Sequence, residues 1–122
     1  MARILLVDDN AALRGSMARN LVHLGHEIAQ AEDGLDAIAH MEEDPRFEVV
    51  LLDLEMPRMN GRATVLHMLS RFPTLARRTI VVTGAAIDDA TQEWIDRDVG
   101  GFFAKPVSIE RLRFAIDRLC AT

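Results

Sequence analysis

Reactive side chains stand directly after four short apolar runs of this 122-residue sequence. In chain order they are Asp8-Asp9 after residues 3–7, Asp53 after residues 48–52, Thr83 after residues 79–82 and Lys105 after residues 101–104. Carboxylates are the ligands of hard divalent cations such as Mg²⁺. A hydroxyl and an ammonium group suit the oxygens of a phosphoryl group. The combination therefore suits one divalent cation and one phosphoryl group.

The apolar runs have the length and the Val, Ile and Leu content of buried parallel strands. A more polar run at 27–31 indicates an edge strand. An amphipathic stretch follows each run, which predicts an α/β fold, a single-domain doubly wound (βα)5 sandwich with a five-stranded parallel sheet over residues 1–122. In such sheets, ligands bind beyond the carboxyl ends of the strands, so the reactive side chains should meet at one rim.

Five helices are expected, each with an apolar stripe at helical spacing. The stripes are Leu13, Met17, Leu21 and Leu24; Leu35, Ile38 and Met41; Val65, Leu66, Leu69 and Phe72; Ala90, Trp94 and Ile95; and Ile109, Leu112, Ile116 and Leu119. Gly25 and Pro73 should end the first and third helices. Asp88 or Asp89 should cap the fourth helix, and Ser108 the fifth. Phe114 points away from the last stripe, toward solvent.

The composition indicates a soluble globular protein, with 49% hydrophobic and 27% charged residues. The net charge of −5 argues against direct binding to nucleic acid or to an anionic membrane. No apolar stretch approaches the ~20 residues that span a bilayer. The single cysteine, Cys120, and a start without room for a signal peptide favour the cytoplasm.

At the predicted rim, Asp8, Asp9 and Asp53 would repel one another unless a cation such as Mg²⁺ lay between them. Asp53 could act as a nucleophile, because carboxylates form acyl phosphates by in-line attack. Lys105 would neutralise one phosphoryl oxygen, and the hydroxyl of Thr83 would donate to another. Each residue alone is as typical of a loop or a helix cap, and the coincidence at four strand ends favours the site.

The sequence resembles the receiver domain of two-component response regulators over nearly its full length. The matching segments are Ile4-Leu5-Leu6-Val7-Asp8-Asp9-Asn10, Leu51-Leu52-Asp53-Leu54-Glu55-Met56-Pro57-Arg58-Met59-Asn60-Gly61, Val82-Thr83-Gly84 and Phe103-Ala104-Lys105-Pro106. The Asp-x-x-Met-Pro-x-Met-x-Gly pattern after the third run is the most specific of them.

This resemblance implies strand order 2-1-3-4-5 and a switching phosphoacceptor that is not an enzyme in the ordinary sense. A histidine kinase or histidine phosphotransfer protein would phosphorylate Asp53. Mg²⁺ would be held by Asp9, Asp53 and the main-chain carbonyl of Glu55, with Asp8 acting through water. Thr83 and Phe102 would be the switch residues. An unknown output partner, or a second copy, would bind the face of the fourth helix, fifth strand and fifth helix.

Two departures affect the switch rather than the reacting groups. Phe102 stands where many family members have tyrosine, and Gly84 follows Thr83 where alanine or serine is common, which leaves the rim more open. Three other classes of protein have related features: a haloacid-dehalogenase-like phosphatase, a flavodoxin-like cofactor binder and a pseudo-receiver that is not phosphorylated. The order of the motifs argues against the phosphatase, and the lack of a phosphate loop argues against the cofactor binder. The complete residue set argues against the pseudo-receiver. The sequence leaves open whether the chain acts alone or belongs to a hybrid kinase.

Overall fold

The computed structural model describes residues 1–121. Within this part of the chain there are five strands and six helices, and no helix is long and apolar enough to cross a membrane. The strands are β1 (Arg3–Val7), β2 (Glu27–Ala31), β3 (Val49–Leu52), β4 (Thr79–Thr83) and β5 (Gly101–Ala104). The helices are α1 (Ala11–His23), α2 (Gly34–Glu43), α3 (Gly61–Arg71), α4 (Pro73–Arg77), α5 (Asp89–Asp98) and α6 (Ile109–Cys120).

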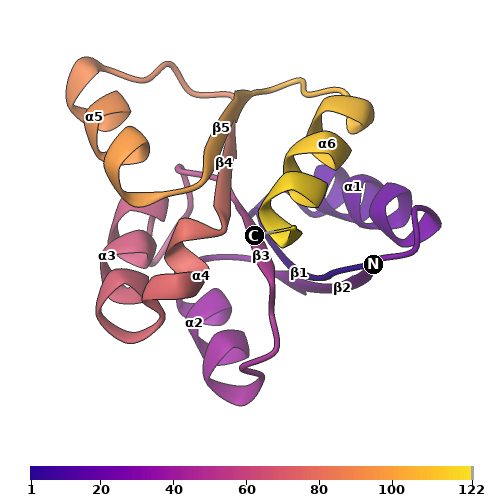
Figure 1. Ribbon diagram of the computed structural model, residues 1–122. Helices are drawn as coiled ribbons and strands as arrows, with labels where there is room; N and C mark the ends of the chain where they lie inside the picture. Colours follow the sequence, from indigo (N-terminus) through magenta and orange to yellow (C-terminus); the bar gives the residue numbers. More distant parts are fainter. Residues whose placement is uncertain (122) are drawn as a thin grey trace.

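The strands form one parallel sheet in the order β2-β1-β3-β4-β5, which confirms the predicted fold class and strand order (Figure 1). The polar strand β2 lies at an edge, as its composition predicted. Val7 pairs with Leu52, so Asp8 and Asp53 follow neighbouring positions of the central strands. Thr83 pairs with Ala104, the residue before Lys105. The register thus aligns the strand ends that carry the reactive groups.

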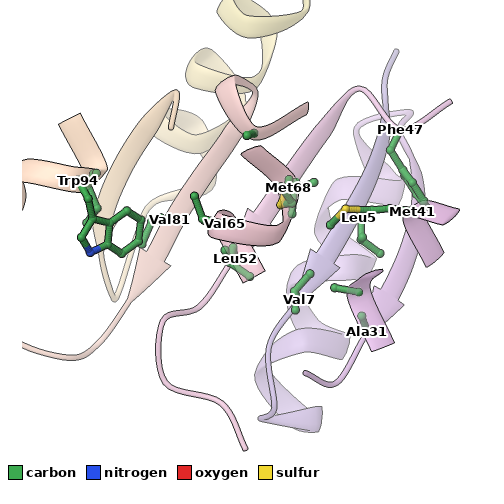
Figure 2. Packing of buried hydrophobic residues seen from close by; sticks show 14 residues of the cluster. Leu5, Val7, Ala31, Met41, Phe47, Leu52, Val65, Met68, Val81 and Trp94 are labelled. Carbon is green, nitrogen blue, oxygen red and sulfur yellow. The ribbon is translucent and has the colours of Figure 1, made fainter. Parts of the chain in front are cut away.

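Helices cover both faces of the sheet, with α1 and α6 on one side and the other helices opposite (Figure 1). Under α2, α3 and α5, strand residues such as Leu5, Leu52 and Val81 pack against Met68 and Trp94 (Figure 2). Alternate strand residues pack against α1 and α6 in a second cluster. The central strands are therefore buried on both faces, which explains their continuous apolar sequences.

Side-chain caps begin the helices α1, α2, α3, α5 and α6. Each cap oxygen accepts a hydrogen bond from a backbone amide in the first turn, which satisfies a donor that the helix itself cannot. The caps are Asn10, Asp33, Asn60, Asp88 and Ser108. Asp88 thus resolves the alternative left open for the fourth predicted helix, and Ser108 is the cap that the sequence predicted.

The expected number of helices was wrong, because Pro73 begins the short helix α4 instead of only closing the preceding helix. Proline lacks an amide hydrogen and fits the first helical turn, where that donor has no helical partner. The predicted apolar stripes also included residues that the structure leaves exposed. Leu13 and Leu66 are 52% and 51% exposed, whereas Met68 is fully buried. The buried face of α3 follows Val65 and Met68, so Leu66 points outward.

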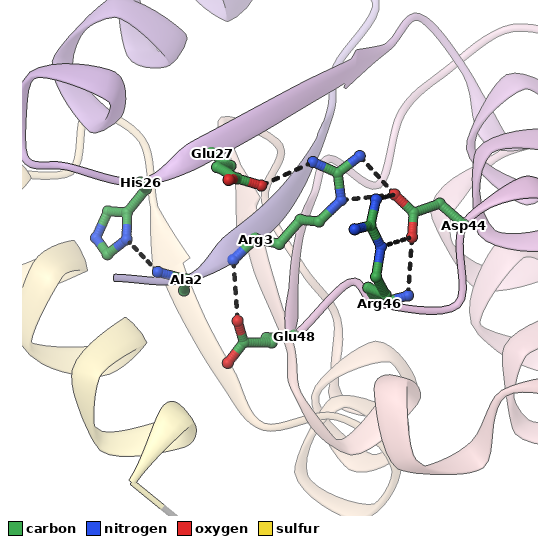
Figure 3. Close-up of polar contacts among 7 residues, drawn as sticks. All are labelled: Ala2, Arg3, His26, Glu27, Asp44, Arg46 and Glu48. Atoms are coloured by element: carbon green, nitrogen blue, oxygen red, sulfur yellow. Dashed lines mark hydrogen bonds and ion pairs between the residues drawn. The ribbon is translucent and has the colours of Figure 1, made fainter.

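Polar contacts at the amino ends of the strands hold β1 to its neighbours (Figure 3). His26 Nδ1 accepts a hydrogen bond from the Ala2 amide at 2.9 Å. Arg3 pairs with Asp44, with 2.6 Å between Nε and Oδ2, and with Glu27, with 3.1 Å between Nη1 and Oε2. Burial and the N-terminal charge lower the pKa of His26. These contacts lie at the end of the sheet opposite the predicted rim.

Candidate functional site

A cleft at the carboxyl ends of the strands brings the predicted reactive side chains together. It is lined by Asp8, Asp9, Asp53, Thr83 and Lys105, with Glu55 and Gly84 also on its wall. The strand order explains this, because β1 and β3 are neighbours and β4 and β5 follow next to β3. Residues from four separate parts of the sequence therefore share one site, as ligands do in open parallel sheets.

Three carboxylates form the acidic side of the cleft. Asp8, Asp9 and Asp53 can each direct one oxygen so that these atoms lie within 4.8 Å of one another. Asp8 and Asp53 are buried, whereas Asp9 is exposed. Mg²⁺ prefers oxygen ligands, is often held by one or two carboxylates and keeps several waters. This donor set, open to solvent on the side of Asp9, fits such a cation.

Lys105 is the basic group of the cleft. Its Nζ lies 2.6 Å from Oδ2 of Asp8 and 3.3 Å from Oδ2 of Asp53. Burial by itself lowers the pKa of Lys105. The hydrogen bond that Lys105 donates to Asp8 and the charges of Asp53 and Asp8 outweigh this effect and raise the pKa above its usual value. One ammonium against three carboxylates leaves the cluster with two excess negative charges, which a divalent cation balances.

Backbone and side-chain donors that sequence reasoning missed contact the two buried aspartates. The Asn10 amide donates to Oδ1 of Asp8 at 2.9 Å, and Arg14 Nη1 donates to the Asp8 carbonyl at 2.6 Å. The Glu55 amide lies 3.4 Å from Oδ1 of Asp53. The position of Arg14, one helical turn after Asn10, was the available indication in the sequence. The two amide contacts orient the carboxylates, and the Arg14 contact holds the Asp8 backbone.

The predicted switch residues lie at different depths. Thr83 is 1% exposed at the end of β4, and its Oγ1 accepts a hydrogen bond from the Ala85 amide at 3.2 Å. Phe102 is partly buried and packs against the core cluster beneath α5. A Cβ atom added to Gly84 would lie 3.9 Å from the Lys105 Cβ, an ordinary contact distance. The glycine is therefore not required by space and leaves the rim more open than alanine would.

The loop after Asp53 is closed tightly at Gly61. The Gly61 amide donates to the Leu54 carbonyl at 2.9 Å. A Cβ atom at this position would lie 2.7 Å from the Leu54 Cα and 2.8 Å from the Asp53 carbonyl oxygen. Only glycine avoids this overlap, so the last residue of the Asp-x-x-Met-Pro-x-Met-x-Gly pattern is needed for the backbone to approach so closely.

The strand order and the residues at the rim together define a receiver domain. The chain belongs to the response regulator receiver domain family, whose pattern matches residues 4–117. This membership decides against the haloacid-dehalogenase-like and flavodoxin-like alternatives.

The relatives include both short and longer proteins. The chain is 31% identical to Protein PilH of Pseudomonas aeruginosa, over 99% of each chain. It is 35% identical to a response regulator receiver protein of Anaeromyxobacter sp. (strain Fw109-5), and it covers only 46% of that protein's length. The fold matches the crystal structure of a receiver domain protein from Clostridium thermocellum with a TM-score of 0.90 over 99% of this chain and 95% of the other, at 23% identity.

Proposed function

We propose that residues 1–122 form one receiver domain that accepts a phosphoryl group on Asp53 in a Mg²⁺-dependent reaction. The donor is a histidine kinase or a histidine phosphotransfer protein, and the chain is a stoichiometric phosphoacceptor rather than an ordinary enzyme. The contact of Lys105 with both Asp8 and Asp53, beside the exposed Asp9, is the observation that carries this proposal. A pseudo-receiver usually lacks one or more of these groups, whereas this chain has the complete set.

In the proposed reaction, a carboxylate oxygen of Asp53 attacks the phosphorus of a phosphohistidine in line. A P–O bond forms as the P–N bond breaks, and the bonding electron pair returns to the imidazole nitrogen. Lys105 neutralises one phosphoryl oxygen and Thr83 donates to another. Asp9, Asp53 and the main-chain carbonyl of Glu55 would hold Mg²⁺, with Asp8 acting through water. The bound cation supplies positive charge that lets an anionic phosphoryl group enter an acidic cleft.

The switch in this proposal starts from the oxygens of the phosphoryl group. Thr83 exchanges its present contact with the Ala85 amide for a contact with the phosphoryl group, which moves the loop after β4. Phe102 changes its rotamer as this loop moves, although its ring cannot make the hydrogen bond of a tyrosine hydroxyl. The face of α5, β5 and α6, which corresponds to the predicted fourth helix, fifth strand and fifth helix, then binds an output partner or a second copy.

An apolar groove beside the cleft supports docking of the phosphoryl donor. It is lined by Leu13, Met17, Pro106 and Val107, and it reaches Asp8 and Lys105. The 52% exposure of Leu13 provides an apolar contact for a donor helix. We propose a cytoplasmic protein without direct binding to nucleic acid or membrane, in keeping with its net charge of −5. Relatives of nearly equal length and of greater length support both a stand-alone regulator and a domain of a hybrid kinase.

The test is phosphorylation by acetyl phosphate in the presence of MgCl₂, followed by intact-mass measurement. The wild-type chain should gain one acid- and base-labile phosphoryl group, and Asp53→Asn should gain none. Asp117→Asn is the matched control, because it makes the same change at an exposed carboxylate on α6. Phosphorylation of Asp53→Asn at the wild-type rate, or of the wild type in EDTA, would contradict the proposal.

A further inference from the structure

The loop between β3 and α3 contains a strained turn at Arg58. Its φ of 63° lies in the left-handed region, which residues with long side chains rarely adopt. The Met59 amide donates to the Pro57 carbonyl at 2.7 Å, which closes a three-residue turn around Arg58. γ-turns whose central φ is positive are rare and strained. Such a conformation persists only where the surrounding structure holds it in place.

Asp33, at the start of α2, holds the side chain of Arg58. Both Nε and Nη2 of the guanidinium lie 2.5 Å from Oδ2 of Asp33. Oδ1 of the same carboxylate accepts the Asp36 amide at 2.9 Å as the cap of α2. Asp33 is only 2% exposed. Burial alone raises the pKa of Asp33, but the Asp36 amide and Arg58 together lower it below its usual value. The Asp33 carboxylate is therefore charged and held in place.

A backbone contact beside this pair fixes the same loop. The Gly34 amide donates to the Met59 carbonyl at 3.1 Å. A Cβ atom at Gly34 would lie 2.6 Å from that carbonyl oxygen and 2.2 Å from Thr64 Oγ1, so the loop packs closely on α2. The Gly61 amide closes the other end of the loop on the Leu54 carbonyl. Between these fixed points lies Glu55, which follows Asp53 by two residues and lines the cleft.

We propose that the Arg58–Asp33 ion pair is a latch that positions the Glu55 backbone for the divalent cation. Arg58 and Asp33 are thus positioning residues that act through the loop and touch neither the cation nor the phosphoryl group. This inference rests on the proposed function, because it concerns the proposed Mg²⁺ site. Groups that orient metal ligands affect metal affinity without coordinating the metal themselves.

The direction in which Arg58→Ala changes the Mg²⁺ affinity separates the latch from a simple charge effect. Arg58→Ala removes a positive charge near an acidic cleft, and Coulomb attraction alone would then strengthen cation binding. If the latch orders the loop, the same substitution weakens cation binding instead. We expect a loss of about threefold to tenfold, below the roughly 10–100-fold typical for groups bonded directly to metal ligands.

The experiment titrates MgCl₂ into the full chain and follows backbone amide chemical shifts around the cleft. Arg71→Ala is the matched control. The Arg71 side chain is 57% exposed against 55% for Arg58. It joins α3 to α2 through Glu42 at 3.5 Å, whereas Arg58 joins the loop before α3 to the cap of α2. Arg58→Ala should weaken Mg²⁺ binding and speed hydrogen exchange at the Met59 amide, whereas Arg71→Ala should change neither. Arg58→Lys, which keeps the charge but loses the planar fork, should recover part of the affinity.

Asp33→Asn gives an independent test because the side chain keeps an oxygen for the cap of α2. Asp33→Asn should weaken Mg²⁺ binding. Because the two residues form one contact, the double variant with Arg58→Ala should have the same Mg²⁺ affinity as the single variant that binds Mg²⁺ less tightly. At saturating MgCl₂, each variant should be phosphorylated by acetyl phosphate close to the wild-type rate. Wild-type or tighter Mg²⁺ affinity in Arg58→Ala would overturn the latch.

The results also separate this inference from the proposed function. Normal Mg²⁺ binding by the wild type without phosphorylation of Asp53 would overturn the proposed function alone. Absence of Mg²⁺ binding by the wild type would overturn both. Normal phosphorylation and Mg²⁺ binding in the wild type, together with an unaffected Arg58→Ala variant, would overturn only the latch.

Discussion

Lys105→Met is the most direct test of the electrostatics in the cleft. Lys105 is the only lysine in the sequence, and methionine is an uncharged side chain of similar length. The Lys105 side chain is 22% exposed, and its ammonium contacts Asp8 and Asp53, whose side chains are each 10% exposed. Without the Lys105 ammonium, the three carboxylates lose the positive charge that contacts two of them. We therefore expect the variant to be less stable in EDTA and to bind Mg²⁺ more tightly.

The magnitude follows from the distances. At 3.3 Å, the attraction between Nζ of Lys105 and Oδ2 of Asp53 is about 5 kcal/mol at an effective dielectric constant of 20 and about 1.3 kcal/mol in water. Desolvation of the ammonium offsets much of this gain. A net loss of about 1–3 kcal/mol in the free energy of unfolding is expected. Mg²⁺ no longer competes with an ammonium for the same oxygens, so its affinity should rise about tenfold or more, since 1.4 kcal/mol corresponds to tenfold.

Urea unfolding, followed by the fluorescence of the single tryptophan, measures this effect in EDTA and at a series of MgCl₂ concentrations. Trp94 is 8% exposed in the core, so its emission should change on unfolding. The stability difference between the two proteins should shrink as MgCl₂ rises, because the variant gains more from binding. Equal stability in EDTA together with equal Mg²⁺ affinity would refute the claim that Lys105 balances the carboxylates.

Other substitutions test single contacts. Gly61→Ala should cost about 1–3 kcal/mol of stability and slow Asp53 phosphorylation, because its Cβ would lie 2.8 Å from the Asp53 carbonyl oxygen. Gly15→Ala, whose Cβ meets only a side-chain atom at 3.6 Å, should be neutral or stabilising in the same urea titration. Because the pKa of His26 is lowered in the folded protein, the unfolded chain binds a proton more readily, and the free energy of unfolding should fall as the pH drops below 6.5, the ordinary pKa of histidine. His26→Gln should remove this dependence on pH. Phe114→Ala, at a residue 72% exposed, should weaken self-association or partner binding in sedimentation assays without changing phosphorylation, and unchanged association would make Phe114 an incidental surface residue.

The sequence predicted the strands and the rim because both have strong local indications. A strand buried on two faces must be apolar throughout, and the residue after it enters the cleft. This rule alone predicts the positions of Asp53 and Lys105 at the rim. The strand order did not follow from the apolar pattern, because several orders bury the same strands equally well. It came from the resemblance to a family.

The helices were predicted less well because a surface helix needs only part of its apolar residues for the core. Leu13 has the spacing of a buried residue but lies in the first turn of α1, beside the cleft and the apolar groove. Its exposure depends on how far the helix extends past the sheet, which local spacing does not encode. The closer contact of Lys105 with Asp8 than with Asp53 is likewise set by backbone geometry, although the sequence named all three residues.

The contact between Arg58 and Asp33 was beyond sequence reasoning for a different reason. Arginine has no preference for a positive φ, and its partner lies 25 residues away at the start of another helix. The turn exists because two tertiary contacts, the ion pair and the Gly34 amide, hold a conformation that the local sequence disfavours. The motif after β3 specifies Asp53 and the closing glycine, Gly61, and it leaves the residue at position 58 free to vary. If the latch holds the Glu55 backbone as proposed, a residue outside the reacting set determines how firmly the cation is bound. Receivers with the same rim would then differ in Mg²⁺ affinity according to the partner that position 58 finds on α2.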